Sequence, residues 1–411
     1  MFKKLVNNII IYGLTNALKS LVPFIMLPIL THYLSVKDYG VLSLIETSIL
    51  FISPFVMLNI HSAISVEYFT AKDKDDFAKY VTNSLILTVF SFLMVFFILN
   101  LFSKQFSQII HIDEFWIKIL AFLAFLKIIP LVVLTIFQSS NQPFKYFLFS
   151  IFLVLFDFTL SYILIVFCDK GILGRIIGVY GAYFLFSIMG FYILYKLRYV
   201  VLKIILKFSK QILEYGVPLI AHSIGGIVLA MSDRYFLAYF VDNKVVGLYT
   251  VAYQISGIML LFSMSINQAW RPMLYNLLKN SNLKKAKQIN FVLVVIFILS
   301  FCILYFIIPL IYKILINERF YNSKIFVLWL LIGFLFQSLY FIYTNYLFFY
   351  KKTKLLSVIT FSGAILNIIL NYIGIKLFGS IGVAYATAIT WVFYFLAVYY
   401  FSNKLIKLEN G

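Results

Sequence analysis

Twelve long apolar runs divide this chain, and they limit its fold more than any other feature. Each is close to or above the roughly 20 apolar residues that a helix needs to cross a bilayer. The runs do not alternate between polar and apolar residues, which excludes barrel strands. They cover residues 5–33, 39–61, 79–103, 115–137, 145–168, 176–196, 212–240, 246–270, 286–316, 324–348, 353–378 and 381–402. The sequence therefore predicts an all-α integral membrane protein with twelve transmembrane helices and short loops.

Composition supports the membrane assignment. The chain is 63% hydrophobic and only 12% charged, and a soluble domain cannot cover that much apolar side chain with its own surface. The first run follows Lys3 and Lys4, as in a signal peptide, but it continues past Tyr33 with no small-residue cleavage site near its end. We therefore interpret it as a retained first helix.

The net charge of +19 is distributed as in a membrane protein. With the N-terminus inside, 21 of the 34 Lys and Arg residues fall in inner segments and 10 in outer loops. This bias predicts a multi-pass protein with both termini in the cytoplasm. The basic stretches Lys196–Lys210 and Arg271–Lys287 are expected to meet anionic membrane lipids. Nucleic acid is not an expected partner.

The second half of the chain repeats the first. GRIIGVYGAY, from Gly174, is echoed by FGSIGVAYAT, from Phe378, and Gly178 then corresponds to Gly382. THYLSVKDYG, from Thr31, is echoed in the same order by AYFVDNKVVG. Six helices per half is an even number, so the sequence predicts two parallel lobes related by a pseudo-two-fold axis along the membrane normal. The N-terminal lobe would comprise residues 1–205, including a basic inter-lobe segment, and the C-terminal lobe residues 206–411.

Charged side chains inside the apolar runs are candidates for function because each costs roughly 2.5–3.5 kcal/mol at the bilayer centre. Lys19 and Arg234 lie on the first and seventh helices, which hold equivalent places in the two lobes. Together they would line a shared cavity suited to an anionic substrate, and a guanidinium suits phosphate well. The alternative is that Lys19 snorkels to the interface or reaches Glu46, and that Arg234 pairs with Asp233.

Other intramembrane groups are candidates for a gate or for coupling to H⁺ or Na⁺. They are Glu46, Asp157, Asp233 and His222. Glu46 is at a depth where it can pair with Arg234, and Asp157 is level with Lys127 on a neighbouring helix. For these residues, buried structural pairs or hydrogen-bonded packing are the alternative. Pro23 and Pro28 remove two backbone donors from the first helix, so they form either a hinge or a fixed kink.

The sequence gives no support for catalysis. Asp73 and Asp75 form a D-x-D pattern of the kind used by metal-dependent glycosyltransferases. They lie in a short lysine-rich loop, and this context favours a solvated run of charges over a metal site. Nucleotide-binding glycine loops, zinc spacings and nucleophile constellations are absent from the sequence, and Cys168 and Cys302 are far apart. We expect no enzyme activity, cofactor or metal.

Three segments resemble one family of exporters. MSDRYFLAYFVDNKVVGLYTVAYQI (Met231–Ile255), NQAWRPML (Asn267–Leu274) and LPILTHYLSVKDYGVLSL (Leu27–Leu44) are similar to patterns of the Wzx-type polysaccharide flippases in the multidrug/oligosaccharidyl-lipid/polysaccharide (MOP) exporter superfamily. The resemblance extends over nearly the whole chain.

The resemblance implies a bacterial inner-membrane flippase that works by alternating access. Its substrate would be an O-antigen or capsule repeat unit, an oligosaccharide linked to undecaprenyl pyrophosphate. Lys19, Arg234 and Arg271 match positions where the pyrophosphate would bind, although Arg271 also reads as an inner-surface anchor. A polysaccharide polymerase and chain-length proteins are further expected partners.

Three alternatives remain open. A cation-coupled multidrug exporter of the MATE branch would need an acidic or aromatic cavity. A membrane polysaccharide polymerase or ligase would need a large outer loop, and a lipid II flippase usually has two further helices.

Overall fold

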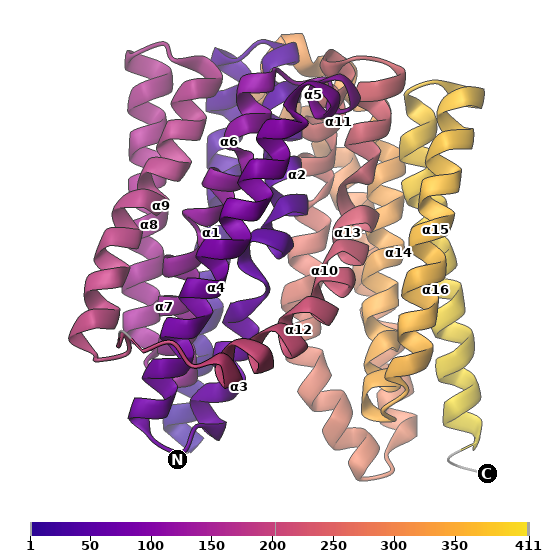
Figure 1. The fold of residues 1–411 in the computed structure, drawn as a ribbon. Helices are drawn as coiled ribbons and strands as arrows, with labels where there is room; N and C mark the ends of the chain where they lie inside the picture. Colours follow the sequence, from indigo (N-terminus) through magenta and orange to yellow (C-terminus); the bar gives the residue numbers. More distant parts are fainter. Residues whose placement is uncertain (1, 202, 409–411) are drawn as a thin grey trace. The chain divides into compact units, whose positions relative to one another are not determined.

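The computed structural model describes the backbone of residues 2–201 and 203–408, and the side chains of these residues except 2–10, 222, 407 and 408. Over these ranges the chain is helical, with short connections (Figure 1). The helices of the first half are α1 (Phe2–Tyr33), α2 (Val36–Met57), α3 (Ile60–Thr70), α4 (Lys74–Leu101), α5 (Ser103–Ile110), α6 (Glu114–Phe125), α7 (Ile128–Ser139), α8 (Pro143–Tyr162), the π-helical η1 (Ile163–Phe167) and α9 (Gly171–Lys196). Those of the second half are α10 (Leu206–Phe240), α11 (Asn243–Ser256), α12 (Ile258–Lys279), α13 (Leu283–Leu315), the 3₁₀ turn η2 (Glu318–Ser323), α14 (Lys324–Phe349), α15 (Thr353–Phe378) and α16 (Ile381–Leu408).

The predicted number of membrane spans is confirmed. Among the described residues, twelve helical stretches are long and apolar enough to cross a membrane. Several of them are built from two elements rather than one. The fourth span, Glu114–Ser139, is α6 followed by α7, and the eighth, Asn243–Lys279, is α11 followed by α12. Run length alone does not predict these breaks, although Pro130 closely follows the first and Gly257 stands at the second.

Short polar side chains start many of the spans. Ser35 Oγ accepts a hydrogen bond from the Asp38 amide at the start of α2, 3.1 Å away. Asp242 accepts one from the Val245 amide at the start of α11, at 2.8 Å. Such N-caps satisfy amides that have no partner within the helix. Ser35 and Asp242 occupy corresponding positions in the repeated segments THYLSVKDYG and AYFVDNKVVG. The repeat therefore places an N-cap residue at the start of a helix in each half of the chain.

The chain separates into two compact units, Met1–Ile227 and Val228–Gly411. In the first, α2 packs against α4 and α6, α8 packs against α1 and α9, and α7 packs against α3 and α9. In the second, α14 is central and packs against α11, α12, α13 and α16, while α15 packs mainly on α16. The division falls within α10, whereas the sequence places the lobe boundary at 205/206, before this helix. The assignment of whole helices to two lobes stays a prediction.

Glycines let the last two spans of each unit approach closely. A β-carbon at Gly178 of α9 would collide with the backbone of Ser161 on α8, and one at Gly382 of α16 with the backbone of Gly374 on α15. Gly178 and Gly382 are the corresponding glycines of the repeated motif. The repeat therefore marks the same close helix crossing in both units, as the sequence indicated.

The segment after α9 is attached to α4. Thr82 and Asn83 of α4 are both buried. Thr82 Oγ1 accepts from the Val201 amide and Asn83 Oδ1 from the Ile205 amide, each at 2.9 Å, while Asn83 Nδ2 donates to the Lys203 carbonyl at 3.0 Å. Figure 1 shows this stretch passing α4 on its way to α10. Side chains of a transmembrane helix thus fix a segment that has little regular structure of its own.

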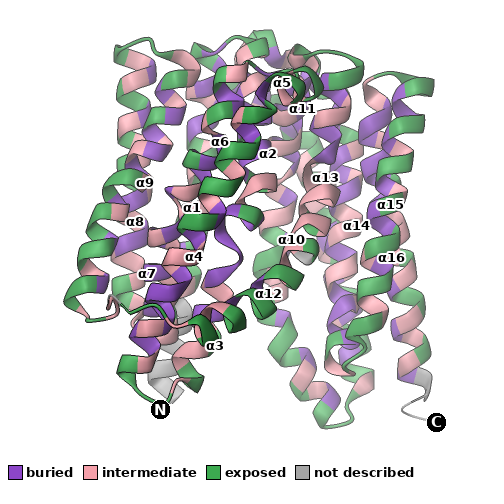
Figure 2. Cartoon of the chain, in the orientation of Figure 1, coloured by how far each residue is buried: buried purple, intermediate pink, exposed green. Residues whose placement is uncertain are grey.

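Large apolar side chains remain exposed on many helices, as expected where lipid replaces water. α13 is an example, with Phe306 78% and Phe291 70% exposed. Figure 2 shows exposed residues recurring along the spans between buried ones. The burial pattern therefore fits a multi-pass membrane protein.

Candidate functional site

Lys19 stands on α1 and is half-buried. Its Nζ lies 5.8 Å from the centroid of the Tyr146 ring, which in turn meets Tyr12 edge to face at 5.1 Å. Tyr146 is close to the start of α8, so the ammonium lies toward one end of the first unit. A lysine over an aromatic face keeps its charge available to an anion while its stem is covered.

Arg234 is buried in the second unit, 4% exposed, beside an equally buried Asp233. Its Nη1 lies 3.1 Å from Asp233 Oδ1, and its guanidinium carbon lies 4.6 Å from the centroid of the Tyr253 ring. Asp233 also accepts a hydrogen bond from the Tyr249 hydroxyl. These contacts tie α10 to α11, and they satisfy both charges within the unit.

An asparagine network continues from the same part of α10. Asn367 and Asn371 of α15 are buried and hydrogen bonded to each other at 3.0 Å. Asn367 also donates to Thr390 Oγ1 of α16 at 3.3 Å and accepts from Ser232 Oγ at 3.2 Å. The sequence-based prediction concentrated on charged residues inside the apolar runs and did not include these asparagines. Two asparagines four residues apart in an apolar run were the available signal, because such a pair lies on one helix face.

Asp157 of α8 has a partner that the sequence did not indicate. Arg175 of α9 places Nη1 2.6 Å from Asp157 Oδ1 and 2.9 Å from Ser161 Oγ, and Ser161 also donates to Asp157 at 3.0 Å. The two charged side chains are only 11% and 13% exposed. Arg175 thus joins two helices inside the first unit.

Lys127 occupies the break between α6 and α7. Its Nζ lies 5.1 Å from the ring centroid of Tyr180 and 5.5 Å from that of Tyr183, both on α9. The charges of Glu46 and Asp157 act on it electrostatically. Glu46 itself is exposed on α2. Four charged groups, from α2, the break before α7, α8 and α9, therefore lie near one another in the first unit.

The other predicted residues are dispersed. Arg271 is exposed on α12. Pro23 and Pro28 both lie within α1, which continues through them. The side chain of His222 lies outside the described residues. A hinge, a gate and a pyrophosphate site at these positions stay predictions.

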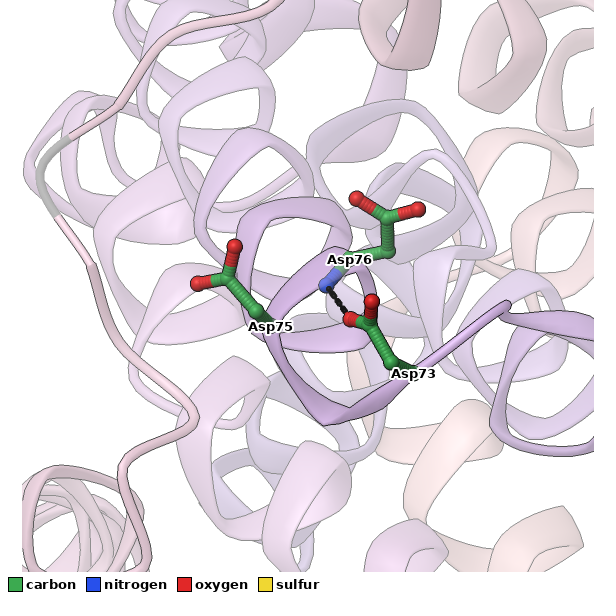
Figure 3. A group of neighbouring side chains, drawn as sticks. All are labelled: Asp73, Asp75 and Asp76. Atoms are coloured by element: carbon green, nitrogen blue, oxygen red, sulfur yellow. Dashed lines mark hydrogen bonds between the residues drawn. The ribbon is translucent and has the colours of Figure 1, made fainter.

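Among the described residues, the acidic start of α4 is where carboxylates come close enough to hold a cation. Figure 3 shows Asp73, Asp75 and Asp76, with the Asp76 amide bonded to Asp73 at 2.8 Å. Asp73 caps α4, and Asp75 and Asp76 both pair with Lys79. Each carboxylate thus has a partner at the start of α4.

Comparison with known proteins places the chain. The family model described as "Polysaccharide biosynthesis protein" matches residues 5–278. The chain belongs to this family. A second model, MatE, matches residues 218–373. The "Lsg locus putative protein 1" of Haemophilus influenzae is 24% identical over 410 residues, covering 96% of this chain and 98% of the relative.

Solved structures share the fold. One is an inward-facing multidrug resistance MATE transporter of the MOP superfamily, with a TM-score of 0.75 and 14% identity, covering 95% of this chain and 96% of that one. Another is the lipid II flippase MurJ in an inward closed conformation, with a TM-score of 0.79 and 15% identity, covering 96% of this chain and 87% of that one. The predicted fold class and the resemblance to the MOP superfamily are confirmed. This polysaccharide biosynthesis protein is a multi-pass membrane protein.

Proposed function

We propose that this polysaccharide biosynthesis protein flips undecaprenyl-pyrophosphate-linked oligosaccharide repeat units across the bacterial inner membrane, for O-antigen or capsule export. The observation that carries the proposal is the match of its family model to residues 5–278, joined to a MOP-type fold. Alternating access is the proposed mechanism. The termini are proposed to lie in the cytoplasm, on the more basic side of the protein.

Three cationic side chains are proposed to bind the pyrophosphate. Lys19 is half-buried beside Tyr146 and Arg271 is exposed, so neither is sealed in a core. Arg234 is held by Asp233, and we propose that it meets the pyrophosphate only in a conformation in which this pair is open. Charge-assisted hydrogen bonds from such groups are the strong contacts available to phosphate oxygens.

Coupling to H⁺ or Na⁺, if the transporter uses it, would act through Glu46, Asp157 or Asp233. Asp157 and Asp233 each hold an arginine, so an incoming cation would compete with a guanidinium. Glu46 is exposed and is the simplest place for a proton to arrive. A polysaccharide polymerase and chain-length proteins are the proposed partners in the pathway.

A cation-coupled multidrug exporter is the second candidate, favoured by the MatE match over residues 218–373. Its substrates would be cationic, so loss of Lys19 would leave or improve their transport. A flippase for an anionic carrier would lose activity with the same substitution.

A strain without this gene tests the proposal. Undecaprenyl-linked repeat units would be located by leaflet, with a plasmid copy of the gene as the control. Single units accumulating on the cytoplasmic face, with no surface polymer, support a flippase. Units trapped on the outer face would point to a missing polymerase instead, and normal polysaccharide with raised dye retention would favour the drug exporter.

A further inference from the structure

The first unit contains a groove that the proposed transport function does not use. It has a volume of about 620 Å³ and lies among α7, α8 and α9. Ligand sites commonly measure about 300–1,000 Å³. Its lining is formed by apolar side chains and two lysines: Phe137, Lys145, Leu148, Phe149, Phe152, Phe186, Met189, Ile193, Lys196 and Leu197.

Three phenylalanines from three helices make the floor. Phe137, Phe149 and Phe186 are each buried. Phe149 meets Phe137 edge to face at 6.3 Å and Phe186 at 5.2 Å. Edge-to-face packing of this kind fixes the rings against one another. The groove is therefore formed before any ligand arrives, which lowers the cost of filling it.

The walls are open to the surroundings. Phe152 is 58% and Met189 45% exposed. From Leu197 to Phe186 the groove follows α9 for roughly 16 Å at 1.5 Å per residue. That is about half of the roughly 30 Å hydrocarbon core. The apolar part therefore has the depth of one lipid leaflet.

Both lysines stand at the same end of the groove. Lys145 lies near the start of α8 and Lys196 ends α9, its antiparallel neighbour. Both are exposed, and neither has an ion-pair partner within the described ranges. Lys196 is the usual cation at a helix C-terminus, but Lys145 is near a helix N-terminus, where the dipole disfavours a cation.

An anion bound at the Lys145 end of the groove would offset the unfavourable interaction between the Lys145 charge and the helix dipole. The first turn of α8 contains no acidic residue, and its N-cap, Gln142, makes no side-chain cap. Pro143 in this turn has no amide hydrogen, so Phe144 and Lys145 carry the amides at the helix start, and such amides bind phosphate well. Two lysines and this helix start therefore lie at the same end of a groove whose floor is apolar.

We propose that this groove binds one anionic phospholipid of the leaflet at the Lys145 end. Its phosphate lies between Lys145, Lys196 and the start of α8, and an acyl chain lies along Phe149 and Phe186. Phosphatidylglycerol has this chemistry. The undecaprenyl carrier is a poorer fit, because its chain is far longer than a groove of one-leaflet depth.

Native mass spectrometry of the full-length protein tests the proposal. The probes are phosphatidylglycerol and phosphatidylcholine with identical acyl chains, titrated into wild type and Lys145→Gln/Lys196→Gln. Lysines near a membrane surface contribute about 1 kcal/mol each, so phosphatidylglycerol binding should weaken roughly thirtyfold in the double variant. Phosphatidylcholine binding should be weak and equal in both proteins.

Lys284→Gln/Lys285→Gln is the matched control, since both lysines are exposed at the start of α13. It should bind phosphatidylglycerol as wild type does. Leu148→Trp/Met189→Trp, which narrows the groove and keeps the lysines, should lose the lipid as well. Equal binding by wild type and the Lys145/Lys196 variant would overturn the proposal, as would equal loss in the control. Displacement of phosphatidylglycerol by an equal concentration of undecaprenyl phosphate would show that the carrier is the occupant. Lipid binding is measured here without transport, so the result stands apart from the flippase proposal.

Discussion

Arg175 Nη1 lies 2.6 Å from Asp157 Oδ1, and this contact joins α9 to α8 inside the first unit. Taking two charges out of water is costly, and the cost is offset only while both partners are present. Ser161 adds hydrogen bonds to both side chains. The pair therefore makes each residue depend on the other.

Arg175→Met and Asp157→Leu should each lower the free energy of unfolding by about 3 kcal/mol, because each leaves one buried charge alone. The double variant should be close to wild type. Thermal unfolding in detergent measures all three. A double variant that loses the sum of the two single effects would show that the pair is not coupled.

Gly178→Ala and Gly382→Ala should each destabilise the protein by about 2 kcal/mol, because overpacking a tight contact forces backbones apart. Gly13→Ala is the control, since its β-carbon would meet nothing within 4 Å. That substitution should be neutral or stabilising by about 0.5–1 kcal/mol. Unfolding midpoints in one detergent would be compared. Equal effects at all three positions would contradict the close crossings.

Asn83→Ala should release the segment between α9 and α10, because three hydrogen bonds to Lys203, Ile205 and Ser209 are lost with the amide. If the lost bonds together are worth about 1.4 kcal/mol, the segment opens roughly tenfold more often. Timed trypsin cleavage at Lys203 and Lys207 measures this. Asn100→Ala, at a half-buried asparagine near the other end of the same helix, is the control. Equal cleavage rates in the two variants would refute the attachment.

Arg234→Ala should lower both the amount of folded protein and surface polysaccharide, because Asp233 is then left buried without its cation. Asp233→Asn/Arg234→Gln removes both charges and keeps hydrogen bonding. We expect it to restore the amount of protein but not export. Immunoblots and polysaccharide assays on the same cells separate the two readouts. Export that returns in proportion to protein would limit Arg234 to a structural role.

Lys19→Ala and Arg271→Ala should reduce export by tenfold or more if each makes a charged contact of about 1.5–3 kcal/mol with the pyrophosphate. Lys19→Arg should retain most activity. Lys104→Gln, at an exposed lysine of α5, is the control. Export would be normalised to protein in the membrane. Unchanged export in the Ala variants would remove both residues from the proposed site.

The spans and the repeat could be predicted because their signals are local. An apolar run of 20 residues crosses a membrane as an α-helix. Gly178 and Gly382 lie within sequence motifs that occur in both halves of the chain. The pair Asp157–Arg175 could not be predicted in this way. Arg175 is near the start of α9 and Asp157 is well inside α8, so run lengths put them at different depths. The long arginine side chain spans the distance in depth between the two backbone positions.

The helix breaks have local signals that the length of an apolar run does not use. The break before α7 falls at Leu126 and Lys127, and Pro130 in the first turn of α7 has no amide hydrogen to donate to the Leu126 carbonyl. Gly257 stands at the break between α11 and α12. The contacts of Lys127 with Tyr180 and Tyr183 of α9 could not be predicted, because periodicity describes one helix and not its partners.

The attachment of the inter-lobe segment to Thr82 and Asn83 also bears on how the protein can be divided. Val201, Lys203 and Ile205 are held by α4, so they belong by their contacts to the first unit. A cut between Ile205 and α10 would leave the hydrogen bonds of Val201, Lys203 and Ile205 on the first fragment, and the bond from Ser209 to Asn83 would then link the two fragments. Genes encoding residues 1–205 and 206–411 separately, expressed in one cell, are therefore the natural pair from which to seek a working transporter assembled from two chains.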